Sequence, residues 1–352
     1  MISILLFPKG IAKMTEIYVD KNAEKDTGFT TLTEAIQALP SDEHEPVLIR
    51  IAPGEYYEKI ELRRDNVTIE GTGNSADQTV LYYDDCARQD MPDGSKRGTF
   101  RSYSFFIDAG NITVKNLTIA NTSGTEDKAW QAIALYADGN DLTFENVRLI
   151  GHQDTLFTGP LPPKELQPGG FIGPKQFDER INGKHHYKNC YICGNVDFIF
   201  GSATALFEDC EIESIARAFD VQKKSSADKQ SSLKYIEEIP VQGYVTAPST
   251  PEGQEYGYIF KGCSFVSKDC PPESVYLGRP WRDYAKAVFI DCTVGEHICR
   301  EGFHDWDKAY ARECSFFSCF GCFRPEGEAY TPAAPFARTI NEEELDLLIK
   351  NF

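Results

Sequence analysis

A chain of 352 residues with 41% hydrophobic residues can bury the core of one large domain or of two ordinary ones. Its 36 Lys and Arg against 54 Asp and Glu leave a formal net charge of −18, which repels phosphate backbones and excludes nucleic acid as an expected partner. No apolar stretch is long enough to span a membrane, so no membrane partner is expected either.

The N-terminal segment, residues 1–14, is expected to be a flexible or non-native leader. Its apolar run, residues 2–7, is too short for a signal-peptide core and follows no basic residue. The 11 cysteines are scattered, and several lie in strand-like segments, which indicates buried thiols rather than a disulfide framework. These features predict a cytoplasmic protein with one domain over residues 15–352.

Two helices are predicted, one near each end of the chain. Residues 30–40, TTLTEAIQALP, place Leu, Ala and Ile side chains on one face and end at Pro40, so this helix would cap an open end of the core. Residues 339–352 begin with Asn341 as an N-cap, followed by acidic residues in the first turn. This second helix is expected to pack on the outside.

Between the helices one pattern recurs: a short β-rich segment, a bend with Asn, Asp, Gly or Glu, and another short β-rich segment. It occurs in residues 66–71, 111–121, 141–151, 186–194, 205–213, 258–266, 287–295 and 311–317. A cysteine follows the bend at Cys190, Cys210, Cys263, Cys292 and Cys314. The short spacings between them indicate a coil of roughly 20–24 residues, with loops inserted in some turns.

Such a coil predicts an all-β, single-domain parallel β-helix, in which rungs stack at about 4.8 Å and the cysteines form an interior column. A β-sandwich is the alternative, but it calls for Asn-Gly hairpin turns, and Asn182-Gly183 is the only such dipeptide. Two loops are predicted: residues 158–183, rich in Pro and Gly, and the polar residues 220–240.

A carboxylate interrupts an apolar run at Asp197 in GNVDFIFGS, where a buried charge is costly unless it is paired or used. Asp154 lies in GHQDTLF beside Gln153, and Gln131 precedes Gln153 by 22 residues, about one coil. Asp154 and Asp197 are 43 residues apart, again about one coil once the Pro- and Gly-rich loop is subtracted. We therefore expect these four side chains on adjacent rungs of one face.

Each of these residues also has an ordinary structural interpretation. Asp197 could cap a turn or face solvent on an alternating strand, and Asp154 could form an Asx turn. Gln131 could satisfy a buried backbone group. The order and spacing of the residues favour a shared site over these alternatives.

Metal binding is a weaker interpretation of two other motifs. Cys190 and Cys193 are three residues apart in a strand and so point to opposite faces, which suits zinc poorly. Cys319-x-x-Cys322 lacks ligands that would complete a site. No metal or cofactor is therefore expected. The Asn-x-Ser/Thr sequons are expected to be structural asparagines at strand bends: Asn66, Asn111 and Asn116.

QAIALY, GHQDTLF, NVDFIFG and YLGRPW, in this order, resemble the motifs of the pectin methylesterase family, the carbohydrate esterases that remove methyl groups from pectin. The resemblance covers about residues 15–330 and implies a right-handed parallel β-helix, in agreement with the repeats. It also implies an enzyme without metal or cofactor, expected to be a monomer, that acts on methyl-esterified pectin or oligogalacturonides.

The resemblance implies a role for each side chain of the site. Asp197 matches the nucleophile that forms an acyl-enzyme intermediate, and Arg279 would pair with it and keep it ionised. Asp154 matches the general acid and later the base, with its pKa raised by the neighbouring carboxylate. Gln131 and Gln153 match the donors that hold the tetrahedral oxyanion.

Trp281 is expected to stack on a sugar face, and its neighbour Arg282 is expected to be solvated. Three further aromatic side chains are assigned to the substrate-binding surface: Tyr136, Phe157 and Phe200. Phe198 and Phe200 are expected to alternate around Asp197 along the strand. Tyr136 stands where many family members have Arg. Because family members are mostly exported, a secreted protein is the alternative to a cytoplasmic one.

The loop at residues 158–183 directly follows the Asp154 motif, so it is expected beside the groove. There it would narrow or close one end and favour short oligogalacturonides over polymer. The alternatives are an esterase or thioesterase for another substrate, or a non-catalytic carbohydrate-binding β-helix. A pectate lyase or polygalacturonase would share the fold, but these enzymes need Ca²⁺-binding acids or paired acids in other motifs.

Overall fold

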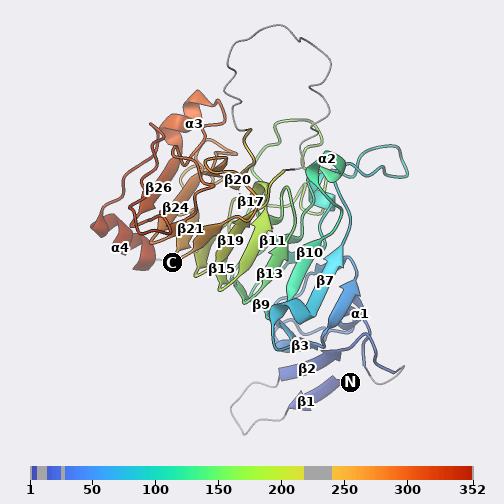
Figure 1. Cartoon of the computed structure of the whole chain (residues 1–352). Helices are drawn as coiled ribbons and strands as arrows, with labels where there is room; N and C mark the ends of the chain where they lie inside the picture. Colours follow the sequence, from blue (N-terminus) through green and yellow to red (C-terminus); the bar gives the residue numbers. More distant parts are fainter. Residues whose placement is uncertain (1, 6–13, 25–27, 218–239, 351–352) are drawn as a thin grey trace.

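The computed structural model describes residues 2–5, 14–24, 28–217 and 240–350 and shows an elongated solenoid whose rungs follow one another from the N-terminal to the C-terminal end (Figure 1). The predicted polar loop at residues 220–240 lies almost wholly outside the described residues. Three sheets run along the solenoid, and successive strands within each sheet pair in parallel apart from the first pair of the first sheet. The predicted right-handed parallel β-helix is confirmed.

In spatial order, the first sheet contains β1 (Ile2–Leu5), β2 (Met14–Val19), β3 (Val47–Ile51), β6 (Val67–Gly71), β9 (Ile112–Lys115), β12 (Leu142–Glu145), β15 (Lys184–Lys188), β18 (Thr204–Glu208), β21 (Tyr258–Lys261), β24 (Lys286–Ile290) and β26 (Phe316–Phe320). The second contains β4 (Gly54–Tyr57), β7 (Thr79–Tyr83), β10 (Thr118–Asn121), β13 (Arg148–Ile150), β16 (Tyr191–Gly194), β19 (Glu211–Ser214), β22 (Ser264–Val266) and β25 (Thr293–Val294). The third contains β5 (Ile60–Leu62), β8 (Phe105–Asp108), β11 (Leu135–Asp138), β14 (Leu156–Thr158), β17 (Val196–Gly201), β20 (Gly243–Pro248) and β23 (Val275–Gly278).

Both predicted helices are present and capped as their sequences indicate. In α1 (Leu32–Gln37), the hydroxyl of Thr31 accepts a hydrogen bond from the Glu34 N–H, and the apolar face packs on β2 and β5. In α4 (Glu342–Lys350), Asn341 and Glu344 exchange side-chain-to-backbone hydrogen bonds of 2.9 and 3.0 Å, which is a capping box. The helix packs against the outside of the first sheet. The other helical segments are α2 (Glu126–Ala129), α3 (Ala309–Cys314), η1 (Ala76–Gln78) and η2 (Thr99–Arg101).

Aromatic rings stack inside the solenoid along the first sheet. Phe144, Tyr187, Phe207, Phe260 and Phe289 occupy equivalent positions of successive strands, with ring centroids 4.4–4.9 Å apart and planes within 8° of parallel. Parallel strands lie about 4.8 Å apart, so side chains at equivalent positions meet face to face. This stack and the surrounding aliphatic side chains form one continuous core.

An interior column of cysteines is also present, with one correction to the prediction. Cys190, Cys210, Cys263 and Cys292 are buried, and each follows a residue with positive φ that turns the chain from the first sheet into the second. The next member is Cys322, after Gly321 (φ 63°), rather than Cys314. Cys314 ends α3, because residues 311–317 form a helix and the start of a strand instead of two strands.

The segment expected to be a flexible or non-native leader contains a short strand. Ile2–Leu5 forms β1, which pairs antiparallel with β2 and extends the first sheet at its edge. Residues 6–13 lie outside the described residues. Regular structure therefore includes part of the segment that the sequence assigned to a leader.

Candidate active site

The two aspartates lie one above the other on adjacent rungs of the third sheet. In the pairing of β14 with β17, Leu156 is opposite Ile199, and the same offset of 43 residues relates Asp154 to Asp197. The Asp154 N–H donates to the Val196 carbonyl at 3.1 Å, which ties the two rungs together at the site. The sequence spacing predicted Asp154 and Asp197 on adjacent coils, and the structure places them there.

Both aspartates have left-handed backbone conformations, with φ 65° at Asp154 and 50° at Asp197. This region is uncommon for a residue with a Cβ and costs about 1–3 kcal/mol, a strain that collects at functional sites. The pairing of β17 with β20 is also irregular between Val196 and Ile199. Simple alternation therefore fails here: Phe198 packs inside the solenoid, while Phe200 packs on the outer face.

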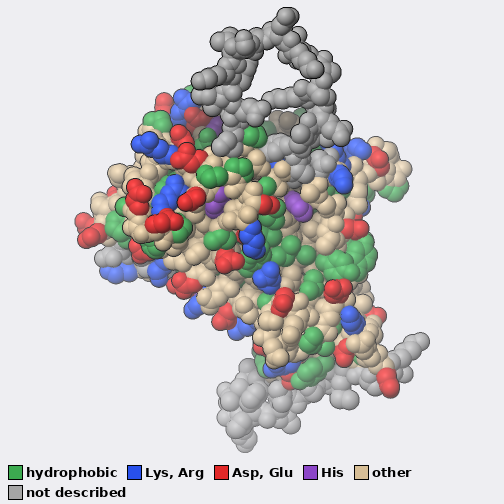
Figure 2. All heavy atoms as spheres, in the orientation of Figure 1, with side chains coloured by type: hydrophobic (Ala, Val, Ile, Leu, Met, Phe, Trp, Pro, Cys, Tyr) green, Lys and Arg blue, Asp and Glu red, His purple; other side chains and the backbone are tan. Residues whose placement is uncertain are grey.

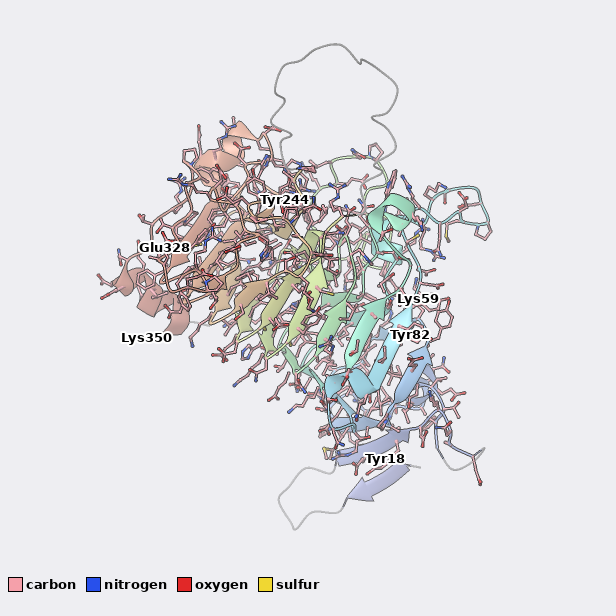
Figure 3. The ribbon with its side chains drawn as sticks, viewed as in Figure 1. Tyr18, Lys59, Tyr82, Tyr244, Glu328 and Lys350 are labelled. Atoms are coloured by element: carbon pink, nitrogen blue, oxygen red, sulfur yellow. The ribbon has the colours of Figure 1, made fainter. Side chains whose placement is uncertain are left out.

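Arg279, just beyond β23, clamps Asp197. Its Nε and one terminal nitrogen each donate to a different carboxylate oxygen at 2.7 Å, and both side chains are largely buried. The guanidinium lies between two rings, 3.7 Å from the ring centroid of Tyr244 and 3.6 Å from that of Trp306. Tyr244, labelled in Figure 3, belongs to β20. This planar sandwich fixes the arginine and hence the rotamer of Asp197.

Asp154 has a different environment from Asp197. Its residue is only 6% exposed, and burial raises the pKa of its carboxyl well above the usual range; the neighbouring Asp197 carboxylate adds to the rise and Arg279 opposes it. The raised pKa of Asp154, beside a carboxylate that Arg279 holds in an ion pair, gives two chemically alike groups different tendencies to bind a proton. Such a difference allows one group to act as acid and the other as nucleophile.

A cavity of about 420 Å³ lies over these residues. Gln131 and Gln153 line it together with both aspartates and Arg279, so the five predicted catalytic side chains share one cavity. Backbone hydrogen bonds hold the glutamine segments: the Ala132 N–H donates to the Gln153 carbonyl at 3.1 Å. The two amide side chains lie on neighbouring coils, as their spacing predicts.

The aromatic residues divide into two groups. Trp281 and Phe200 line the cavity. Tyr136 and Phe157 are each 0% exposed and pack with Phe200 in an aromatic cluster beneath the cavity floor, with ring centroids 4.7 and 4.9 Å apart along the series. The assignment of Tyr136 and Phe157 to the substrate-binding surface does not fit this burial, and these side chains support the floor instead.

Arg282 also departs from its expected solvated position. It lines the cavity, where its guanidinium lies 4.7 Å from the ring centroid of Trp281 and donates to the carbonyl of Lys164 at 3.2 Å. The sequence therefore did not indicate that Arg282, Tyr244 and Trp306 belong to the site. A Trp in the polar stretch FHDWDKAY was the one available signal for Trp306.

The predicted loop after the Asp154 motif stands beside the cavity, as expected from sequence adjacency. Four of its residues line the cavity: Leu166, Gln167, Gly170 and Phe171. Lys175 anchors the loop by pairing with Asp108 of β8 at 2.6 Å and with Asp178 at 2.9 Å. The ring of Phe171 packs edge-on to Trp281 at 6.3 Å, so the loop contacts the part of the cavity wall that Trp281 forms.

Asp138, under this anchored loop, carries an expected pH effect on stability. Burial raises the pKa of Asp138 to about 7, opposed by Lys175, and one of its oxygens has no hydrogen-bond partner among the described residues. The folded protein then holds this proton up to a pKa of about 7, whereas the unfolded chain releases it near 4, so the free energy of unfolding falls as pH rises between these values. We expect Asp138→Asn to remove this fall. The free energy of unfolding of the variant should exceed that of wild type by roughly 2–4 kcal/mol at pH 8, and by little at pH 4. Urea unfolding across pH 4–8 measures the free energy of unfolding of both proteins. If it changes with pH in the same way in the variant and in wild type, the prediction is contradicted.

Among the described residues, no group of three or more His, Cys, Asp or Glu side chains is arranged to hold a metal ion. Asn116, one of the sequon asparagines, donates from its side chain to the Gly71 and Gly73 carbonyls, which fits the structural role expected for it. None of the helices in the described ranges is long and apolar enough to cross a membrane.

Comparison with known proteins identifies the family. The Pectinesterase family model matches residues 18–160 and 181–329. Pectinesterase QRT1 of Arabidopsis thaliana is 28% identical over 333 residues, which cover 94% of this chain and 74% of that protein. Probable pectinesterase 56 of the same plant is 31% identical over 279 residues, with 78% and 80% coverage.

Solved structures agree. The pectin methylesterase PemA from Erwinia chrysanthemi superposes with a TM-score of 0.70 at 26% identity and covers 94% of each chain. The pectin methylesterase from Yersinia enterocolitica has a TM-score of 0.66 at 27% identity, covering 90% of this chain and 96% of that one. The chain therefore belongs to the pectinesterase family and is a carboxylic ester hydrolase that removes methyl esters from pectin.

Proposed function

We propose that the enzyme works through Asp197 as nucleophile and Asp154 as acid and base. The observation that carries this assignment is the pair of aspartates in one register, of which Arg279 clamps only Asp197. The carboxylate of Asp197 attacks the C6 carbonyl of a methyl galacturonate, and an acyl-enzyme anhydride forms as methanol departs. Asp154 gives its proton to the methoxide oxygen and then takes one from the water that hydrolyses the anhydride.

In this mechanism Gln131 and Gln153 donate hydrogen bonds to the oxyanion of each tetrahedral intermediate. Both amides line the cavity beside Asp154 and Asp197. Each such donor is worth about 3 kcal/mol in the transition state. Trp281 stacks on a sugar ring at the cavity wall.

The test of the proposed function is methanol release from high-methoxyl pectin and from methyl-esterified oligogalacturonides. This release is expected to be unchanged by EDTA. Faster cleavage of acetyl esters or thioesters than of these methyl esters would contradict the proposal.

We further propose that the loop favours short oligogalacturonides over polymer. Residues 161–180 fall between the two stretches that match the family model, and the loop brings Leu166 and Phe171 to the cavity wall. A solved pectin methylesterase of similar fold was crystallised with a hexasaccharide, so oligosaccharides are a suitable substrate class to test. Short substrates would suit a cytoplasmic enzyme, whereas polymeric pectin would suit an exported one. The location of the protein and its monomeric state stay predictions.

Replacing residues 161–180 with a short Gly-Ser link is expected to raise the ratio of polymer to trimer activity by roughly tenfold, because the wall that obstructs a long chain is removed. The measurement is methanol release per enzyme from high-methoxyl pectin and from trigalacturonate trimethyl ester. Leu166→Ala is the milder companion variant, since this side chain is 71% exposed and its loss leaves the fold intact. An unchanged ratio in both variants would contradict the role of the loop.

A further inference from the structure

Arg282 is a second arginine in the cavity wall, and no carboxylate among the described residues pairs with its charge. Within the part of the chain that the structure describes, its guanidinium bonds only to the backbone carbonyls of Trp281 and Lys164, at 3.0 and 3.2 Å. Asp283, the next residue, favours its charge but forms no ion pair with it. Arg279, by contrast, is neutralised by Asp197.

The guanidinium of Arg282 has donors left for a ligand. Arginine carries five N–H groups in a planar fork, and the two backbone contacts use two of them. Its plane is held near the ring of Trp281, 4.7 Å from the centroid, so it is already oriented. Burial lowers the pKa of Arg282 to about 10, which leaves the side chain protonated at neutral pH.

Lys308 adds a second positive charge behind the same wall. It donates to the carbonyls of Pro280 and Trp281 at 2.8 and 3.1 Å, and it has no acidic partner in the described ranges. The chain as a whole carries −18, and Figure 2 shows acidic and basic side chains interspersed over one face of the molecule. A local excess of positive charge at the cavity wall attracts an anion that the rest of the surface repels.

We infer that Arg282 binds the free carboxylate of the galacturonate next to the one whose methyl ester is cleaved. This inference rests on the proposed function, because it places the scissile ester at Asp197. Both residues line one cavity, with Trp281 beside Arg282 to carry the sugar ring. A carboxylate accepts two hydrogen bonds from the planar fork, whereas a methyl ester offers only a neutral carbonyl. The enzyme thus distinguishes a demethylated neighbour from a methylated one.

The test uses two trigalacturonates that carry a methyl ester on the central residue. One has free carboxylates on both outer residues and the other is fully methylated. Wild type is expected to prefer the first in kcat/KM, and Arg282→Gln to lower this preference by roughly 10- to 100-fold, mainly through KM, because a charge-assisted hydrogen bond is lost. Arg300→Gln, which removes an exposed positive charge outside the cavity, is the matched control and should keep the preference.

Each other outcome has a distinct meaning. If Arg282 only holds the loop through the Lys164 carbonyl, Arg282→Gln will slow both trimers equally, and the inference is overturned. A wild type that cleaves both trimers at equal rates also overturns it but leaves the esterase mechanism standing. No methanol from either trimer contradicts the proposed function itself. Arg282→Lys, which keeps the charge and loses the fork, is expected to retain an intermediate preference and replaces the Gln variant if that one folds poorly.

Discussion

Asp197→Asn is expected to abolish methanol release, with a loss of roughly 10⁴- to 10⁶-fold in kcat, the range seen when a covalent nucleophile is removed. The amide keeps the shape of the side chain and can still accept a hydrogen bond from Arg279, but it cannot attack the ester carbonyl. The measurement is methanol release from the fully methylated trimer, with substrate binding followed separately by inhibition or calorimetry.

The same variant separates the roles of the two aspartates. Asp154→Asn retains the proposed nucleophile and lacks the proposed acid, so it should slow both acylation and deacylation. Rapid acid quenching followed by mass measurement should still detect an acyl-enzyme. Asp197→Asn should never show that adduct. Activity of Asp197→Asn within tenfold of wild type would refute its assignment as nucleophile.

Arg279→Gln is expected to have the largest effect on stability, a loss of about 3–5 kcal/mol in the free energy of unfolding. The substitution leaves the Asp197 carboxylate buried without its partner, and an uncompensated buried charge is strongly destabilising. It also removes the guanidinium between Tyr244 and Trp306. Urea unfolding at pH 7 measures the loss, and Arg300→Gln, at an exposed position, should change stability by less than about 0.5 kcal/mol.

A double-mutant cycle shows whether the charge or the packing is responsible. In Asp197→Asn with Arg279→Gln, no charge from the pair remains buried, so part of the lost stability should return. A cost that is simply the sum of the two single substitutions would mean that the pair contributes no coupling, and that Arg279 acts through its ring contacts alone.

The sequence predicted the rungs well because a parallel β-helix repeats its backbone geometry. A fixed offset between equivalent positions of successive rungs places Asp154 beside Asp197, and the number of residues between the two motifs equals that offset. Outward-facing positions could also be inferred from alternation. The side chains that cover those positions could not be inferred. Phe100, from a segment outside the repeats, packs on Tyr136 and Phe157, and Phe171 of the loop packs on Phe100.

The missed residues share one physical cause. Trp306 and Arg282 lie in connections after strands, where position depends on loop conformation rather than on a period. The left-handed backbone at Asp197 likewise breaks the alternation that Phe198 and Phe200 would otherwise follow. Cys314 was placed in the cysteine column because it follows Glu313 at an expected bend, although the rung closes one segment later at Cys322.

Because Asp154 and Asp197 lie on adjacent rungs, the distance between the proposed acid and the proposed nucleophile is set by the hydrogen bonding between those rungs. Point substitutions in the surrounding loops can change which sugars enter without altering that distance. An inserted residue at the Asp154 motif or within β17 would have the opposite effect, since it would displace the hydrogen bond from the Asp154 N–H to the Val196 carbonyl that ties the two rungs together. Efforts to give this enzyme new specificity therefore have wide freedom in the loops and almost none along the rungs.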